Sequence, residues 1–302
     1  MLVEQTKNTV KKNIKRNKMN YIGRYKLENK LGEGSSGIVY RAYDPIMDRS
    51  IAIKSVKVGL MNEDQIKHTL KEFHHEAKIA GKYTHENIVG IYDVINEGGL
   101  DYIVMEYVPG CSILDYMIAT GTLDVKETLS VIYKCCIGLA YVHYHGVIHR
   151  DIKPGNIMYH PAEDIVKLAD FSISQKIEEQ PVRNAGTIAY MAPEHFDTSR
   201  RITTLTDIFA LGSTMYRMLT RQYPFSKENT ASQIMYESAI PVYELRPGIP
   251  KEVSAIVDKA MAKADVDRFQ SAASLAIEIK HTLNRLYPDA SLFTSSKEYM
   301  LI

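Results

Sequence analysis

Apolar and polar residues alternate along residues 25–58, and this period of two predicts a run of extended strands broken by a turn at 44–48. The stretches 87–95 and 100–108 have a similar β-branched and aromatic character and are predicted as two more strands. Residues 62–81 instead carry apolar side chains at the three- and four-residue spacing of a helix face. The first part of the chain is therefore predicted to be a β-rich lobe with one helix.

The second part of the chain has mainly a helical period, with two short strands expected at 157–159 and 165–169. The segments with helical spacing are 112–120, 124–145, 204–220, 229–238, 251–263 and 270–285. This order of elements predicts an α+β fold with two lobes. The expected divisions are a flexible basic arm at 1–20, the β-rich lobe at 21–107, a larger and mostly α lobe at 108–286, and a tail at 287–302.

Composition indicates a folded protein without a strong global charge. The 302 residues are 45% apolar, and the formal net charge is +1. So small a net charge argues against a protein that coats DNA or a membrane. No apolar run approaches about 18 residues, so no transmembrane helix is expected, and the charged start does not have the pattern of a secretory signal.

Three local features are expected to have no catalytic role. Basic side chains gather in the first twenty residues at Lys7, Lys11, Lys12, Lys15, Arg16 and Lys18. A solvated flexible arm is the plainer interpretation, and docking to an acidic partner is the alternative. Cys111, Cys135 and Cys136 lack metal-site spacing and are expected to be reduced thiols of a cytoplasmic protein. Structural roles are expected for His68, His74, His75 and His85.

Residues 32–37, within LGEGSSGIVY, have the spacing G-x-G-x-x-G. The spacing alone is a weak signal, because Rossmann folds and ordinary hairpins share it. Here the strand-like stretch IVYRAYD follows the last glycine, where a Rossmann fold would have a helix. A strand–loop–strand hairpin of this kind can direct backbone N–H groups at a polyphosphate.

Lys54 lies in the apolar strand IAIKSV. A lysine in such surroundings needs an anionic partner, because an isolated buried charge is costly. Glu76 on the predicted helix is the candidate, and Glu72, one turn earlier, is not excluded by spacing alone.

The segment VIHRDIKPGNIMY (147–159) concentrates polar residues between apolar flanks, and VKLADFS follows it. Asp151 and Asp170 supply carboxylates, and Asn156 supplies an amide oxygen. Such oxygen ligands suit Mg²⁺, which leaves coordination positions for phosphate oxygens. A carboxylate that does not bind the metal can accept a proton from an attacking hydroxyl, and Lys153 can hold a transferring phosphoryl group.

Together these motifs resemble those of the eukaryotic-type (Hanks-type) protein serine/threonine kinases. The glycine loop, A-I-K, H-R-D-x-K-P-x-N, D-F-x and A-P-E occur in the family's order, and the resemblance covers roughly residues 22–286. The run LRPGIPKEVSAIVDKAMAKADVDRFQSA is similar to the C-terminal helices of bacterial members. The resemblance implies a bilobal kinase-like fold. It also implies ATP-dependent transfer of the γ-phosphoryl group to Ser or Thr hydroxyls of protein substrates, including the protein itself.

The resemblance implies a role for each motif residue. Asp151 is the expected catalytic base beside Lys153, and Lys54, paired with Glu76, is expected to contact the α- and β-phosphates of ATP. Asn156 and Asp170 are the expected ligands of Mg²⁺ or Mn²⁺. Met105 takes the place of the gatekeeper, and residues 106–108 that of the hinge. The residues expected to contact the nucleotide are Leu31, Gly32, Glu33, Gly34, Gly37, Val39, Ala52, Lys54, Met105, Glu106, Val108 and Met158.

Other motif residues have structural roles by the same resemblance. Glu194 and Arg268 are expected to form a buried ion pair, and Asp207 is expected to hold the catalytic loop through its backbone N–H groups. Thr187 is expected to engage the catalytic aspartate and its neighbouring lysine, which is a pattern of kinases specific for Ser and Thr.

The chain departs from the family at Ser172, which replaces the usual glycine of D-F-G. The metal-binding aspartate is retained, so an active kinase is favoured over a pseudokinase that only binds, and A-P-E argues against a small-molecule kinase. No Ser, Thr or Tyr occurs between Gln175 and Gly186, where Glu178 and Glu179 supply fixed negative charges. We therefore expect activity without phosphorylation in the middle of this segment.

Overall fold

The computed structural model describes residues 21–34, 37–56, 69–71, 73–74, 77–79, 81–171, 174–176, 186–225 and 230–288. The chain divides into two compact units. Unit 1 is the chain up to Thr84 together with Val89–Val108, and unit 2 is His85–Ile88 together with the chain from Pro109 onward. The α+β class expected from the sequence is confirmed, because unit 1 is built on a sheet and unit 2 mainly on helices.

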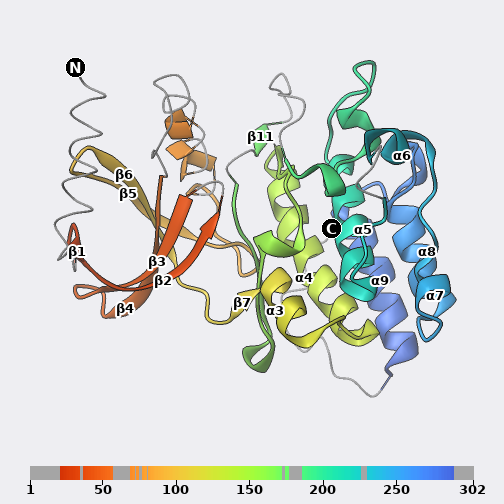
Figure 1. The fold of residues 1–302 in the computed structure, drawn as a ribbon, viewed down its shortest axis with the longest axis horizontal. Helices are drawn as coiled ribbons and strands as arrows, with labels where there is room; N and C mark the ends of the chain where they lie inside the picture. The colour runs from red at the N-terminus through yellow and green to blue at the C-terminus, as the bar shows by residue number, and fades with distance from the viewer. Residues whose placement is uncertain are drawn as a thin grey trace. The chain divides into compact units, whose positions relative to one another are not determined.

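Unit 1 contains a six-stranded sheet in the order β1-β2-β3-β4-β6-β5 (Figure 1). Its strands are β1 (Tyr21–Ile22), β2 (Tyr25–Gly34), β3 (Gly37–Asp44), β4 (Arg49–Ser55), β5 (Ile91–Glu97) and β6 (Leu100–Glu106). Every neighbouring pair is antiparallel. The alternation seen along residues 25–58 therefore corresponds to three consecutive strands.

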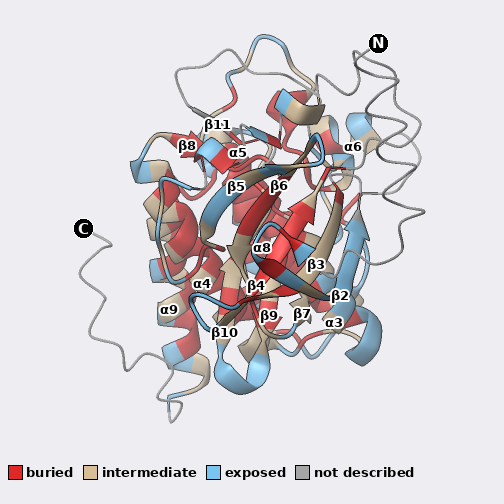
Figure 2. Ribbon diagram, turned by 90° about the vertical axis from the view of Figure 1, so that its left-hand side faces the viewer, coloured by how far each residue is buried: buried red, intermediate tan, exposed pale blue. Residues whose placement is uncertain are grey.

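The two faces of this sheet bury different side chains, because successive residues of a strand point to opposite faces. Ile53 of β4 and Val104 of β6 belong to the core on one face. Ile103 packs with Phe73 on the other. Strand β5, at the edge of the sheet, is mostly exposed, whereas the middle of β6 is buried (Figure 2).

The helix predicted at 62–81 is seen in part. Its described residues, 69–71, 73–74 and 77–79, are helical. Glu72 and Glu76 lie outside the described residues.

The strand predicted at 87–95 begins later than expected, at Ile91. Asn87 and Ile88 belong instead to unit 2. The Asn87 side chain donates to the Val166 carbonyl at 2.9 Å, and Ile88 forms a parallel bridge with Leu168. This pairing with a distant strand outweighs the local strand pattern, which periodicity alone could not show.

Unit 2 is mostly helical (Figure 1). Its α-helices are α3 (Ile113–Thr120), α4 (Val125–Tyr144), α5 (Leu205–Thr220), α6 (Thr230–Tyr236), α7 (Val242–Leu245), α8 (Lys251–Ala260) and α9 (Ala272–Leu286). Its strands are β7 (Cys111–Ser112), β8 (Val147–Ile148), β9 (Ile157–His160), β10 (Ile165–Leu168) and β11 (Gln175–Lys176). Its 3₁₀ turns are η1 (Pro154–Asn156), η2 (Pro161–Glu163), η3 (Ile188–Tyr190), η4 (Pro193–His195) and η5 (Asp265–Asp267). The predicted helices are all present, with ends shifted by up to a few residues.

Side-chain caps explain where three of these helices begin. Ser112, Asp124 and Ser271 each accept a hydrogen bond from the backbone N–H three residues later, at the starts of α3, α4 and α9. Such caps satisfy an N–H group that has no partner inside the helix. None of the described helices is both long and apolar enough to cross a membrane.

Helix α5 lies at the centre of unit 2. It is buried without interruption from Thr206 to Tyr216, so it has no solvent face along this stretch. At Gly212, α5 lies close against the end of α8. A Cβ atom there would lie 2.8 Å from Cγ of Met261 and 2.9 Å from Cβ of Ala260. The close approach therefore requires glycine at this position.

We expect Gly212→Ala to lower the free energy of unfolding by about 1–2 kcal/mol, because overpacking exceeds the gain in helix propensity. The matched control is Ser213→Ala, since the Ser213 hydroxyl is buried without a hydrogen-bond partner in the described structure and its loss is expected to be nearly neutral. Urea unfolding of both variants measures the difference. Equal stability of Gly212→Ala and the parent protein would contradict the packing described for α5.

Candidate active site

The glycine-rich segment joins β2 to β3 as an antiparallel hairpin, so it does not lead into a helix as a Rossmann loop does. Gly34 pairs with Gly37 where the hairpin turns. Gly37 has a φ of +146°, and a Cβ atom there would lie 2.0 Å from the carbonyl oxygen of Ser55. Only glycine fits this position.

Four residues expected at the nucleotide share one face of the unit 1 sheet. Val39 is opposite Lys54, and Ala52 is opposite Met105, and directly opposite residues point to the same face. Lys54 and Ala52 are two residues apart on β4 and therefore also share that face. The Lys54 residue is only 5% exposed. The strand pairing thus places a buried lysine next to small and apolar side chains.

The remaining nucleotide residues of unit 1 lie at strand ends. Leu31, Gly32 and Glu33 are exposed on β2. Glu106 ends β6, and its carboxylate accepts the N–H of Gly90 at 3.1 Å. Val108 follows and is buried. Outside the described residues lie Glu76, Ser172, Glu178 and Glu179, so the expectations for these four positions remain predictions.

The loop after β8 is held by the carboxylate of Asp207 on α5. Asp207 Oδ2 accepts the His149 N–H and Oδ1 accepts the Arg150 N–H, both at 2.8 Å. His143 of α4 contacts Oδ2 through its Nε2, also at 2.8 Å. Burial by itself would raise the pKa of Asp207, but the contact with His143 and the Arg150 N–H hold that pKa below its usual value. The expected bracing of the loop by Asp207 is confirmed.

Asp151 is the centre of the polar contacts in this loop. Its Oδ1 accepts the backbone N–H and the hydroxyl of Thr187, both at 3.1 Å. Its Oδ2 accepts from Lys153 Nζ at 2.5 Å and from Asn156 Nδ2 at 2.9 Å. Lys153 also donates to the Thr187 hydroxyl at 2.8 Å. The structure therefore brings together one carboxylate, one cation, one amide and one hydroxyl from two distant parts of the chain.

His149 connects this loop to the segment that carries Asp170. The Asp151 N–H donates to His149 Nδ1 at 3.3 Å, so Nε2 is assigned the proton that it donates to the Ala169 carbonyl at 3.2 Å. Burial lowers the pKa of His149, which agrees with a neutral ring. The Phe171 ring lies 4.6 Å from the imidazole.

Two residues of the site have backbone conformations that non-glycine residues rarely adopt. Arg150 has a φ of +71° and Asp170 a φ of +65°. Each costs about 1–2 kcal/mol for an L-residue, and such strain concentrates at functional sites. Backbone hydrogen bonds stabilise the chain at or next to both residues. The Arg150 N–H donates to Asp207, and the N–H of Ala169, which precedes Asp170, donates to the Asn156 carbonyl at 2.9 Å.

The donor atoms near Asp170 suit a hard cation. Asn156 Nδ2 donates to the carbonyl and the carboxylate of Asp151, each at 2.9 Å, which leaves Asn156 Oδ1 as the atom available to a metal. The Ala169 N–H bond to Asn156 brings the following residue, Asp170, beside it. One amide oxygen and one carboxylate are a set that Mg²⁺ accepts together with phosphate oxygens and water. Met158, two residues after Asn156 on β9, is partly exposed.

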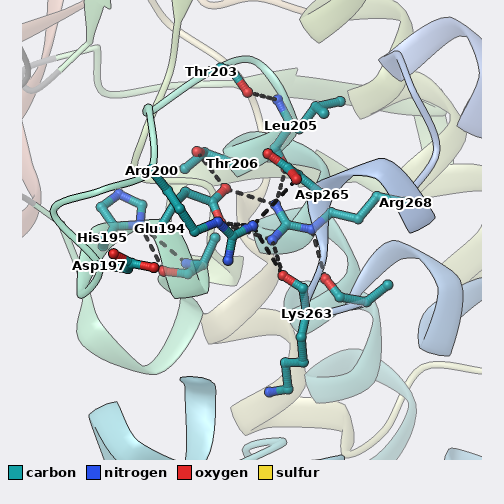
Figure 3. A network of polar contacts seen from close by, with 12 residues as sticks. Glu194, His195, Asp197, Arg200, Thr203, Leu205, Thr206, Lys263, Asp265 and Arg268 are labelled. Atoms are coloured by element: carbon teal, nitrogen blue, oxygen red, sulfur yellow. Dashed lines mark hydrogen bonds and ion pairs between the residues drawn. The ribbon is translucent and has the colours of Figure 1, made fainter. Parts of the chain in front are cut away.

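The expected ion pair of Glu194 and Arg268 is confirmed and is fully buried. Arg268 Nη1 and Nη2 reach the two carboxylate oxygens at 2.7 and 2.8 Å. Burial alone would raise the pKa of Glu194, but Arg268 brings it below its usual value. Arg200 Nη2 lies 3.7 Å from the same Glu194 carboxylate (Figure 3). The same nitrogen lies 3.5 Å from the carboxylate of Asp265.

The sequence motifs do not indicate roles for His143, His149 or Arg200. His149 stands first in the motif H-R-D, so its position was a usable signal. His143 and Arg200 belong to no motif considered above, and their contacts follow only from the three-dimensional packing.

A pH dependence follows from His195, a second buried histidine. Its Nδ1 accepts the Ala192 N–H at 3.2 Å, and burial lowers its pKa below the ordinary 6.5. Below that value the unfolded chain binds a proton that the folded protein resists, so the free energy of unfolding falls as the pH is lowered. We expect His195→Asn, which can keep an acceptor for Ala192 but does not titrate, to lose less stability between about pH 7 and pH 5 than the parent. Urea unfolding at each pH measures both slopes, and parallel slopes would contradict a neutral buried His195.

Comparison with known proteins agrees with this geometry. The family described as "Protein kinase domain" matches residues 25–279. The serine/threonine-protein kinase PrkC of Bacillus subtilis is 33% identical over 265 residues, which is 85% of this chain and 40% of that protein. The probable serine/threonine-protein kinase PknB of Bifidobacterium longum is 34% identical over 289 residues, 90% of this chain and 41% of that protein.

A third relative is the serine/threonine-protein kinase PknB of Mycobacterium leprae. It is 32% identical over 279 residues, which is 88% of this chain and 44% of that protein. The chain thus spans less than half the length of these relatives. The family match, in contrast, covers most of the chain and includes the whole site. The chain therefore belongs to the protein kinase family.

Proposed function

We propose that this protein is an ATP-dependent serine/threonine kinase that transfers the γ-phosphoryl group to hydroxyls of protein substrates, including its own. The observation that carries the proposal is the set of contacts around Asp151, which combines a buried carboxylate with Lys153, Asn156 and Thr187. These are the parts that phosphoryl transfer to a hydroxyl requires. Family membership and the names of the relatives support the same activity.

Asp151 is the proposed catalytic base. The Thr187 hydroxyl donates to Asp151 Oδ1, so this oxygen is already positioned to accept a hydrogen bond from a hydroxyl. A substrate Ser or Thr takes that place. Asp151 accepts its proton as the hydroxyl oxygen bonds to the γ-phosphorus and the bond from that phosphorus to the bridging oxygen breaks, releasing ADP. Lys153, which touches both Asp151 and Thr187, stabilises negative charge on the phosphoryl group.

Asp170 and Asn156 are the proposed ligands of Mg²⁺ or Mn²⁺. When bound, the metal ion neutralises charge on the β- and γ-phosphates. The hydrogen bonds of Asn156 Nδ2 to Asp151 fix the amide so that its oxygen is the ligand atom. The same bonds couple the position of the metal ligand to that of the base.

The face of the unit 1 sheet that carries Lys54 and Ala52 is the proposed site for the rest of ATP. Lys54 binds the α- and β-phosphates and is expected to pair with Glu76, while the glycine hairpin supplies backbone N–H groups. Met105 and residues 106–108 meet the adenine. The strand pairing of Val39, Ala52, Lys54 and Met105 on one face supports this assignment.

The proposal extends to the two lobes, the basic arm and the location of the protein. The β-rich lobe at 21–107 and the helical lobe at 108–286 act as the two kinase lobes, and the basic arm at 1–20 contacts an acidic partner. A cytoplasmic location is supported by three free cysteines, two of them buried.

We expect Asp151→Asn to lower the turnover of phosphoryl transfer by about 10²-fold or more while ATP affinity stays nearly unchanged, because only the proton acceptor is removed. The control is Asp164→Asn, an exposed aspartate that pairs with Lys134. Steady-state transfer of labelled phosphate to a generic protein substrate gives the turnover, and nucleotide binding is measured separately. Full turnover by Asp151→Asn would refute the assignment of the base.

We expect Asp170→Ala to lower transfer by about 10²-fold or more at every Mg²⁺ concentration, because the carboxylate that anchors the metal is lost. Titration of Mg²⁺ into the parent protein, this variant and the control Asp164→Ala, each with ATP present, measures the effect. Transfer by Asp170→Ala at the parent's rate would rule out a metal role for Asp170.

A further inference from the structure

Arg217 is a cation without an anionic partner among the residues that the structure describes. It lies in the last turn of α5 and is partly exposed. Its Nε is buried and has no hydrogen-bond partner there. Two other arginines of unit 2, Arg200 and Arg268, both approach Glu194. A guanidinium is suited to bind a carboxylate with two donors at once, so the Arg217 guanidinium can bind a carboxylate from another molecule.

Aromatic rings hold Arg217 in place at the surface. Its guanidinium carbon lies 4.3 Å from the centre of the Tyr223 ring, in cation–π contact. Tyr223 is 37% exposed and makes an edge-on contact with Tyr190 at 5.9 Å. The stack therefore orients the guanidinium by its face and leaves its terminal N–H donors for another group.

The same stack connects Arg217 to the acceptor site. Tyr190 ends η3, three residues after Thr187, whose hydroxyl contacts Asp151 at 3.1 Å. Burial raises the pKa of Tyr190, the charge of Asp151 raises it further, and the charge of Arg217 opposes this rise. Tyr190 thus packs against the ring that Arg217 covers and lies three residues after the threonine that contacts Asp151. An extended peptide advances about 3.3 Å per residue, so a side chain a few residues from the acceptor can reach Arg217.

A role in stabilising the end of α5 does not account for Arg217. Cations favour helix C-termini, but Arg246 already serves this end, since its Nη1 donates to the carbonyls of Leu219 at 3.1 Å and Leu123 at 2.9 Å. Arg217 makes no bond of this kind to a described carbonyl.

A second arginine follows one turn later. The Arg221 N–H donates to the Arg217 carbonyl at 2.9 Å, and Arg221 has a φ of +59°, where glycine is usual. Arg221 is exposed and pairs with no acid in the described part of the chain. Arg221 therefore adds a second, exposed positive charge just after the end of α5. An anion near this end of the helix is attracted by both arginines.

We propose that Arg217, assisted by Arg221, binds the carboxylate of an Asp or Glu that lies within a few residues of the acceptor Ser or Thr, so that the protein selects acidic substrate sequences. This inference rests on the proposed kinase function and names its substrate class. Arg217 is the specificity-determining residue, and the Tyr223–Tyr190 stack positions it.

The test uses synthetic peptides with one Ser in a neutral background. A single Asp is moved to each position up to about four residues on either side of the Ser, and a matched series carries Lys. We expect Asp at one or two positions to raise kcat/KM about tenfold over the neutral peptide, with Lys lowering it. High salt is expected to reduce the preference, because the pair forms at a partly exposed site.

Two variants decide whether Arg217 is the cause. Arg217→Gln keeps a polar side chain without the charge, and we expect it to remove the preference for Asp but to retain transfer to the neutral peptide. Arg217→Glu is expected to reverse the preference in favour of Lys, which loss of structure alone would not do. Lys251→Glu, an exposed change of equal charge at the start of α8, is the control and is expected to keep the preference for Asp.

The outcomes separate this inference from the kinase proposal. Equal kcat/KM for Asp, neutral and Lys peptides in the parent protein would overturn the inference and leave the kinase function standing. An Asp preference that survives Arg217→Gln in a variant with the parent's melting temperature would also overturn it. Failure of the parent protein to phosphorylate any peptide or generic protein would overturn the kinase function, and the inference with it.

Discussion

The carboxylate of Asp207 is the group on which the geometry of unit 2 depends. It is completely buried on α5, yet it stays ionised because two backbone N–H groups and His143 surround it. Those two N–H groups belong to His149 and Arg150, which directly precede Asp151. The most buried helix of unit 2 thereby fixes the backbone beside the proposed base. Removing one partner from such a buried, charged group costs several kcal/mol, so the loop has little freedom to move.

The same physical rule explains the other charged groups of unit 2. Glu194 is buried but bonded by both terminal nitrogens of Arg268, and Asp151 accepts four hydrogen bonds. A buried charge is tolerated when every lone pair has a donor. Arg217 differs, because no described carboxylate faces it. The polar atoms of Glu194 and Arg268 are used within the fold, whereas the charge of Arg217 is not paired with a described acid and can meet a substrate.

Much of the architecture could be predicted from the sequence, because a long segment with a regular hydrophobic period indicates whether it forms a helix or a strand. The strands of residues 25–55 and the helices α4 and α5 are examples. The short strands β9 and β10 were predicted from their apolar residues. Helix α7 was not predicted, because four residues are too few for a period to show.

The motifs predicted the partners of Asp207, Glu194 and Thr187, because the family resemblance supplies contacts between distant residues. Contacts outside the motifs were not predictable in this way. Asn87 joins unit 2 through a hydrogen bond to Val166, 79 residues away. The second cation on Glu194, Arg200, likewise results from packing rather than from any local pattern. Such contacts depend on the folded chain as a whole, which periodicity does not describe.

We propose that the group at Asp151 directs phosphate to aliphatic hydroxyls of protein. The most direct measurement is incubation of the purified protein with γ-labelled ATP, Mg²⁺ and a generic protein substrate, followed by identification of the modified amino acids after acid hydrolysis. We expect labelled phosphoserine and phosphothreonine without phosphotyrosine. Binding of ATP without any transfer of label, or label found on tyrosine, would contradict it.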